Sequence, residues 1–201
     1  MLNKPAHLFN YLSCGPFVDE TDFEQGFWNS VVVANKGALT PFAIFDRTRS
    51  EEEDASSFAG MASYMNASAV NLCVEIGYIV ILPEFQRTHV TTNMVGLLAQ
   101  YALDTPEKGG LGIRRLVWQC SAANGPSQTT AKRMGFQYEG TLRWHWKWPA
   151  HKVIGSNGKS LRKGDPLPES LGRDTVILSI TFEEWESGTK EMVEEKVARK
   201  T

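Results

Sequence analysis

The sequence predicts an α/β (α+β) fold in which a mixed, mostly antiparallel sheet is covered by helices. Segments rich in β-branched and aromatic residues recur along the chain and favour strands. One segment with apolar residues three and four apart favours a helix, and a second helix is indicated by turn residues at its two ends. The expected order is three strands, a helix, a strand, a helix, a strand, a long polar excursion and a last strand, which fits one sheet in one layer. With 201 residues, of which 42% are apolar, the chain is long enough to bury one core, so we expect a single domain over residues 1–201.

Each expected strand is an apolar or alternating run that ends at charges or turn residues. The clearest is Val74–Leu82 (VEIGYIVIL), which stops at Pro83 because proline cannot donate to a sheet ladder. The other expected strands are Phe42–Asp46, Phe58–Met65, Arg115–Ala122, Phe136–Trp148 and Asp174–Phe182.

Two helices are expected after strands. Thr92–Leu103 repeats apolar residues at helical spacing and should pack on the sheet. Ser127–Met134 follows Gly125-Pro126, and Gly135 should end that helix in a left-handed conformation.

The remaining segments give weaker signals. Phe23–Val33 is typical of a short helix that enters a strand. His151–Arg173 is polar and rich in glycine, proline and lysine, which predicts an insertion between two strands. Residues 183–201 are predicted to form a charged helix or a frayed tail with few apolar anchors.

Composition argues against several classes of partner. The formal net charge of −2 gives no field that would gather nucleic acid or anionic lipid. No apolar run approaches the length of a membrane helix and no secretory signal is apparent, so we expect a cytoplasmic protein. The three cysteines, Cys14, Cys73 and Cys120, are widely spaced without a CxxC pair, which predicts reduced thiols and no metal site.

The turn between the clearest strand and the clearest helix, Gln86–Thr91, has the composition of an anion site. Its successive backbone N–H groups and the helix N-terminus can converge on a pyrophosphate. Thr88, Thr91 and Thr92 add hydroxyls that either cap the helix or bind phosphate oxygens, and Arg87 adds positive charge.

At these residues the chain resembles the GNAT acetyltransferase superfamily, in particular its RimJ/RimL-like branch. Five motifs carry the resemblance over residues 73–185, in the family's order: Glu75-Ile76-Gly77-Tyr78, Pro83-Glu84-Phe85-Gln86, the turn Gln86–Thr91, Asn124-Gly125-Pro126-Ser127, and Gly135-Phe136 with Tyr138-Glu139-Gly140 before a late Asp174. Five ordered motifs are a far more specific signal than any one of them.

The resemblance implies direct transfer of an acetyl group from acetyl-CoA, as co-substrate, to a primary amine on a small molecule or a protein N-terminus. It implies catalytic roles for Glu75, Ser127 and Tyr138. The cofactor-binding residues that it implies are Ile79, Val80, Ile81, Gln86, Arg87, Thr88, His89, Val90, Thr91, Thr92, Asn124 and Ser127. Each role has a plainer alternative, because Glu75 could serve a structural ion pair, Asn124 and Ser127 could only cap a helix, and Tyr138 could pack on the sheet.

Two departures from the family pattern qualify this interpretation. His89 and Thr91 stand where the family has small residues in the turn, and the family's first strand has no counterpart near the N-terminus. The alternative function is therefore a catalytically impaired relative that binds CoA or a protein partner. The tryptophans Trp144, Trp146 and Trp148 share one side of an alternating strand, which suits an aromatic wall, a homodimer interface or core packing.

Overall fold

The computed structural model describes residues 5–35 and 37–199, and it has the predicted mixed, mostly antiparallel sheet. The sheet has six strands in the order β1-β2-β3-β4-β6-β5, and only the β3–β4 pair is parallel. The strands are β1 (Leu39–Phe45), β2 (Phe58–Ser68), β3 (Cys73–Ile81), β4 (Arg115–Ser121), β5 (Gln137–Pro149) and β6 (Ser170–Thr181). The fold class predicted from the sequence is confirmed.

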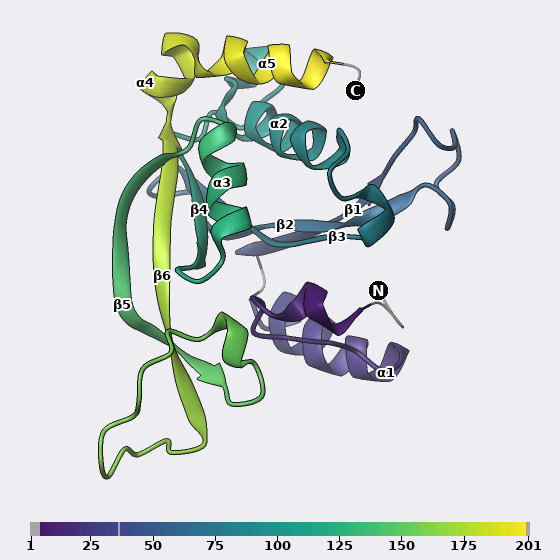
Figure 1. The fold of residues 1–201 in the computed structure, drawn as a ribbon. Helices are drawn as coiled ribbons and strands as arrows, with labels where there is room; N and C mark the ends of the chain where they lie inside the picture. The colour runs from purple at the N-terminus through teal and green to yellow at the C-terminus, as the bar shows by residue number, and fades with distance from the viewer. Residues whose placement is uncertain (1–4, 36, 200–201) are drawn as a thin grey trace.

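Helices cover both faces of the sheet (Figure 1). Helices α2, α3 and α5 lie on one side, while α1 and its continuation η2 lie beneath β1–β3 on the other. The helical elements are η1 (Ala6–Phe9), α1 (Glu20–Phe23), η2 (Glu24–Val33), η3 (Pro83–Phe85), α2 (Val90–Leu103), η4 (Pro106–Lys108), α3 (Gly125–Arg133), η5 (Val153–Gly155), α4 (Phe182–Glu184), η6 (Trp185–Thr189) and α5 (Lys190–Ala198). Within the described residues no helix is long and apolar enough to cross a membrane.

Each of the two helix-covered faces has its own apolar cluster. The larger cluster lies under α2 and α3 and includes Ile76, Leu98 and Phe136. The smaller one holds Phe9, Phe17 and Phe27 of the N-terminal segment against Val80 of β3, so β3 is covered from both sides. This explains why its sequence is almost continuously apolar, as expected for a strand buried on two faces.

The helix α3 ends as predicted. Gly135 follows it with φ +94°, in the left-handed region, and an added Cβ there would lie 2.6 Å from Cγ2 of Thr189. Glycine is therefore required both by the backbone conformation and by the close approach of the C-terminal segment.

The N-terminal segment differs from the expectation of a short helix that leads directly into a strand. Helical turns run from Glu20 to Val33, and β1 begins only at Leu39. Among residues 5–35 and 37–38 there is no strand, so the described sheet begins with β1 at one edge, in agreement with the missing first strand.

The C-terminal segment is a packed helix, which resolves the alternative of a helix or a frayed tail. Trp185 and Val193 are fully buried. Asp104, at the end of α2, accepts hydrogen bonds from Nε1 of Trp185 and from Nζ of Lys190, both at 2.8 Å. Gly96 of α2 allows close contact, since an added Cβ would lie 2.4 Å from Cγ2 of Val197.

The insertion is shorter than predicted because β6 begins at Ser170 instead of Asp174. Its first residues are anchored to the N-terminal segment. The ammonium group of Lys152 is buried and donates to the carbonyl oxygens of Phe9, Leu12 and Cys14. The loop after this anchor projects beyond the sheet from the long β5–β6 pair (Figure 1).

The predicted alternation of β5 is interrupted. The register of β5 against β6 shifts between Leu142 and Trp146, and Trp144 there has φ +53°. As a result the three tryptophans do not form one uniform stripe: Trp148 is 1% exposed, whereas Trp144 and Trp146 are about half exposed.

Candidate active site

A cleft of about 460 Å³ opens where β3 and β4 part. Their parallel pairing runs only from Cys73 with Arg115 to Ile76 with Trp118, so beyond Ile76 one edge of β3 has no neighbouring strand. The N-terminal segment and the ends of β5 and β6 complete the walls. The polar side chains that line the cleft belong to Tyr11, Ser13, Asn35, Asn66, Glu75, Tyr78, Gln119, Asn124, Ser127, Lys147 and Arg173.

Glu75 lies at the centre of this cleft and is only 5% exposed. Its Oε2 accepts hydrogen bonds from Nδ2 of Asn66 at 2.9 Å and from Nε2 of Gln119 at 3.0 Å. Burial raises the pKa of Glu75 to about 7, although these two hydrogen bonds and the positive charge of Arg173 act in the opposite direction. A carboxyl with a pKa near neutrality suits proton abstraction at physiological pH.

The backbone of β3 bulges next to Glu75. Ser63 of β2 pairs with Gly77 and Met61 pairs with Val80, so Tyr78 and Ile79 share the space opposite one residue. Tyr78 has φ +48°, and its ring lines the cleft. A bulge of this kind turns backbone groups out of the ladder and redirects side chains, and such bulges are frequent next to active sites.

Asn124 and Ser127 also line the cleft, on the side of α3. Oδ1 of Asn124 accepts from the backbone N–H of Ser127 at 3.2 Å, so Asn124 caps α3, as the plainer interpretation expects. Oγ of Ser127 accepts from Nε1 of Trp118 at 3.0 Å, and the hydroxyl of Ser127 also hydrogen-bonds to the side chain of Cys120. Both residues therefore combine a structural contact with a position in the cleft.

The structure does not bring Tyr138 to this cleft. Its side chain is 56% exposed on the edge strand β5, and its hydroxyl lies 3.0 Å from Oγ1 of Thr141. The tyrosine that does lie beside Glu75 is Tyr78.

Sequence reasoning missed most of the polar cleft residues, among them Asn66, Gln119 and Arg173. Asn66 and Gln119 come from the strands on either side of Glu75, and nothing local in the sequence marks them. Arg173 directly precedes Asp174 of the last motif, which was the only available signal.

At the far end of β3, the turn before α2 presents several unpaired backbone donors. Among the described hydrogen bonds, none uses the backbone N–H of Arg87, Thr88, His89, Thr91 or Thr92. Arg87 has φ +60°, a left-handed conformation within the turn. Successive free amides at a helix N-terminus form an anion site, so the turn suits a pyrophosphate.

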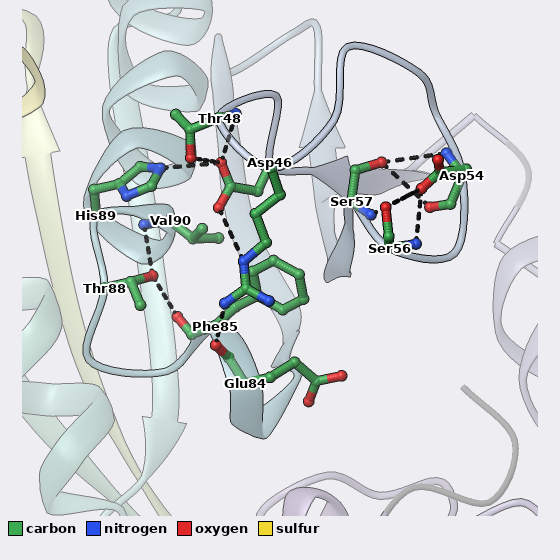
Figure 2. Close-up of polar contacts among 11 residues, drawn as sticks. Asp46, Thr48, Asp54, Ser56, Ser57, Glu84, Phe85, Thr88, His89 and Val90 are labelled. Carbon is green, nitrogen blue, oxygen red and sulfur yellow. Dashed lines mark hydrogen bonds and ion pairs between the residues drawn. The ribbon is translucent and has the colours of Figure 1, made fainter.

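Contacts with the loop after β1 hold this turn in place (Figure 2). Asp46 is buried, and its Oδ1 lies 3.2 Å from Nε2 of His89. The guanidinium of Arg49 donates to the backbone oxygen of Glu84 at 2.7 Å and lies 3.9 Å from the ring centre of Phe85. The ring of His89 is thus directed towards the β1–β2 loop, where Asp46 lies.

Within the turn, Thr88 acts on the backbone. Its hydroxyl donates to the carbonyl of Phe85 at 2.7 Å and accepts from the N–H of Val90 at 3.3 Å (Figure 2). Nε2 of Gln86 donates to the carbonyl of Ile81 at 2.9 Å and ties the turn to β3. Arg133 of α3 reaches Oγ1 of Thr92 at 3.4 Å, which adds a cation that the sequence analysis did not select.

The predicted cofactor residues fall in two places, the cleft and the turn before α2, and they differ in exposure. Ile79 lines the cleft, whereas Val80, Ile81 and Val90 are buried and contribute backbone or packing only. An extended acyl-CoA fits these elements: the unpaired edge of β3 offers backbone groups to its amide arm, and the turn offers N–H donors to its phosphates. Among the described residues no cluster of three histidine, cysteine or carboxylate side chains could hold a metal ion.

The sheet parts beside a buried carboxylate of β3, and the turn that follows β3 presents free backbone amides, an arrangement that suits an acyl-CoA-dependent transferase. The chain belongs to the acetyltransferase (GNAT) family, since the model of the acetyltransferase (GNAT) domain matches residues 11–137. The family membership supports acyltransferase activity.

Solved structures agree with this assignment. A GCN5-related N-acetyltransferase from Brucella melitensis is 27% identical, with a TM-score of 0.70 over 96% of this chain and 72% of that protein. A probable acetyltransferase of the GNAT family from Chromobacterium violaceum is also 27% identical, with a TM-score of 0.65 over 90% of this chain and 74% of that one.

A more distant relative shares the fold alone. The spermidine N-acetyltransferase from Vibrio cholerae, solved with CoA and spermine, is 14% identical, with a TM-score of 0.59 over 92% of this chain and 88% of that one. A search of curated proteins gives no match.

Proposed function

We propose that this protein is an acetyl-CoA-dependent N-acetyltransferase that moves an acetyl group to a primary amine by direct attack in a ternary complex. The observation that carries the proposal is the buried carboxyl of Glu75, with a pKa raised to about 7, at the point where β3 and β4 part. An amine is mostly protonated at neutral pH and needs such a base before it can attack.

In this proposal Glu75 accepts the proton of the acceptor's ammonium group. Its Oε2 already accepts two hydrogen bonds, and within the described residues Oε1 has none, so Oε1 is the oxygen available for the proton. The proton left on the nitrogen after its attack passes to the departing thiolate as the carbon–sulfur bond breaks. The hydroxyl of Ser127, whose oxygen is held by Trp118, turns from Cys120 to hydrogen-bond to that sulfur. Acetyl-CoA supplies the activated acyl group as the thioester.

We place the cofactor where backbone N–H groups of the turn before α2 have no hydrogen-bond partner among the described residues. Phosphates bind the amides of Arg87, Thr88, His89, Thr91 and Thr92, and the arm follows Ile79–Ile81 past Asn124. Nδ2 of Asn124 has no partner among the described residues, which supports a contact to the arm.

The second candidate, a CoA-binding or partner-binding module without catalysis, is not favoured. It rested on His89 in the turn and on the missing first strand. The imidazole of His89 instead lies against Asp46, and the first-turn position of Thr91 leaves its amide free.

Several finer expectations stay proposals: the RimJ/RimL-like branch, a small-molecule amine or a protein N-terminus as acceptor, a cytoplasmic location and a homodimer. The exposed side chains of Trp144 and Trp146 support a dimer interface along β5.

The test is thiol release from acetyl-CoA with a panel of primary amines, together with calorimetric titration of acetyl-CoA. We expect thiol release with a subset of the amines. We also expect the wild type to bind acetyl-CoA and Arg87→Ala to bind it more weakly. Arg162→Ala, in the exposed loop, is the matched control and should bind acetyl-CoA as the wild type does. Binding without thiol release for any amine would favour the second candidate, and absence of both would refute the proposed function.

A further inference from the structure

The described cleft contains an arginine that has no partner. Arg173, at the start of β6, lines the cleft, yet the described residues offer it no ion pair and no hydrogen bond. Its Nε is buried without an acceptor. A buried guanidinium N–H without an acceptor is costly, so such groups in native structures call for an explanation.

The position of the Arg173 side chain is nevertheless well defined. The guanidinium lies 5.2 Å from the ring centre of Trp148, a contact that favours a fixed plane. Trp148 is itself 1% exposed, and its Nε1 donates to the carbonyl of Lys152 at 2.9 Å. The buried indole of Trp148 thus orients the guanidinium of Arg173, while the N–H groups of the guanidinium have no acceptor among the described residues.

The charge of the cleft also favours an anionic ligand. Among the described lining residues only Glu75, Lys147 and Arg173 carry formal charge. When Glu75 is protonated, both remaining charges are positive, and when it is ionised one positive charge remains in excess. Such a cleft disfavours a polycationic acceptor and attracts an anionic group.

Glu75 and Arg173 are two groups of opposite charge type in the same cleft. Both groups line the cleft, and the positive charge of Arg173 lowers the pKa of Glu75, although no ion pair within 4.0 Å joins them among the described residues. Space between a base and a guanidinium suits a molecule that carries its amine and its anion a few bonds apart. Guanidinium groups bind carboxylates through two parallel hydrogen bonds, which also sets the orientation of the ligand.

We propose that the acceptor is a small amine that bears a carboxylate, of the amino-acid class, with its carboxylate on Arg173 and its amine directed to Glu75. This inference rests on the proposed acetyltransferase function and narrows its acceptor. Arg173 is then the specificity-determining residue of the site.

The experiment compares acceptors in matched triads: an amino acid, its primary amide and the corresponding decarboxylated amine. Thiol release is measured for each, with rates expressed per concentration of deprotonated amine. We expect kcat/KM to favour the carboxylate member by at least about tenfold, because a site built for a polar group rejects analogues that lack it.

Two variants separate the role of Arg173 from a structural one. Arg173→Gln is assayed well above pH 7, where Glu75 is ionised with or without the nearby positive charge. There it should abolish the preference by raising the KM of the carboxylate member, and the amide and the amine should lose much less. Arg173→Lys keeps the charge but not the paired donors, so it should retain part of the preference for the carboxylate member. Arg143→Gln, on the exposed part of β5, is the control and should leave the preference intact.

Equal or better use of the two members that lack a carboxylate would overturn the inference. An equal loss for all three members in Arg173→Gln would also overturn it. If no acceptor releases thiol, the proposed function fails and direct binding decides the inference by itself. In that case, calorimetry should show an N-acetylated amino acid binding more tightly than its amide, and Arg173→Gln should erase the difference. Indistinguishable binding of acid and amide would refute it.

Discussion

The side-chain amide of Gln119 donates to Oε2 of Glu75 at 3.0 Å and joins β4 to β3 where the two strands begin to part. The contact helps to hold the carboxyl of Glu75 in the cleft and leaves Oε1 to face an acceptor. The protonation of this carboxyl then controls the pH dependence of the enzyme.

Replacement of Glu75 by glutamine should remove the base with little change of shape. For the wild type we expect kcat/KM to rise with pH through about 7, since burial raises the pKa of Glu75 to about 7 and only the ionised form accepts a proton. In Glu75→Gln, kcat should fall by about 10²–10⁴-fold and this rise should disappear. The measurement is a pH series of initial rates, and an unchanged profile in the variant would exclude Glu75 as the base.

Replacement of Gln119 by leucine should move the same profile. The hydrogen bond from Gln119 stabilises the ionised carboxylate, so its loss should raise the apparent pKa above that of the wild type and shift the rise in kcat/KM to higher pH. Asn66→Leu should act in the same direction because Asn66 donates to the same oxygen. Gln100→Leu, on the surface of α2, is the control, and a shift towards lower pH in either cleft variant would contradict the assignment.

Replacement of Asp46 by asparagine should loosen the turn before α2. Burial opposes the ionisation of Asp46, but hydrogen bonds from Thr48 and the contact with His89 outweigh it and lower the pKa of the carboxyl. We expect Asp46→Asn to raise the KM for acetyl-CoA several-fold at saturating acceptor and to leave kcat nearly unchanged, because the turn binds and does not react.

The matched control for that variant is Asp54→Asn in the same loop. Asp54 accepts hydrogen bonds from Ser56 and Ser57 and has no contact with the turn (Figure 2). Equal KM values for the two variants would show that Asp46 does not support the cofactor seat.

Replacement of Asp104 by alanine should destabilise the packing of the C-terminal helix on α2. It leaves Nε1 of Trp185 and Nζ of Lys190 without their acceptor in a half-buried site, which should cost about 2–3 kcal/mol of unfolding free energy. Chemical denaturation measures this loss. As a control, Glu53→Ala removes an exposed ion pair with Arg47 and should change the free energy of unfolding by less than about 0.5 kcal/mol. Equal losses of stability in Asp104→Ala and Glu53→Ala would contradict the structural role of Asp104.

Local signals explain why much of the fold could be predicted. The alternation or continuity of apolar residues identified all six strands, and helical spacing with Gly135 identified the two helices that follow β3 and β4. The exceptions have physical causes: the bulge around Trp144 breaks the alternation of β5 through a positive φ that no residue in that run announces.

The candidate site was predicted in part for the same reason. Glu75, Asn124 and Ser127 lie in ordered motifs, and the structure places all three in the cleft. The turn Gln86–Thr91 also lies in a motif, and it follows β3, the strand that carries Glu75. Tyr138 was selected by its motif, but the direction of its side chain depends on the register of β5 against β6, and the structure leaves it outside the cleft.

The sequence by itself determined the order of the elements, the family and the cofactor-side motifs, because periodicity, capping and turn chemistry act between residues close together in the chain. Only the tertiary structure decided what surrounds Glu75. Asn66 and Gln119 reach the carboxyl from two different strands, Arg173 of a third strand adds its positive charge nearby, and burial there raises its pKa. Desolvation and charge depend on distance in space, which no local pattern in the sequence records.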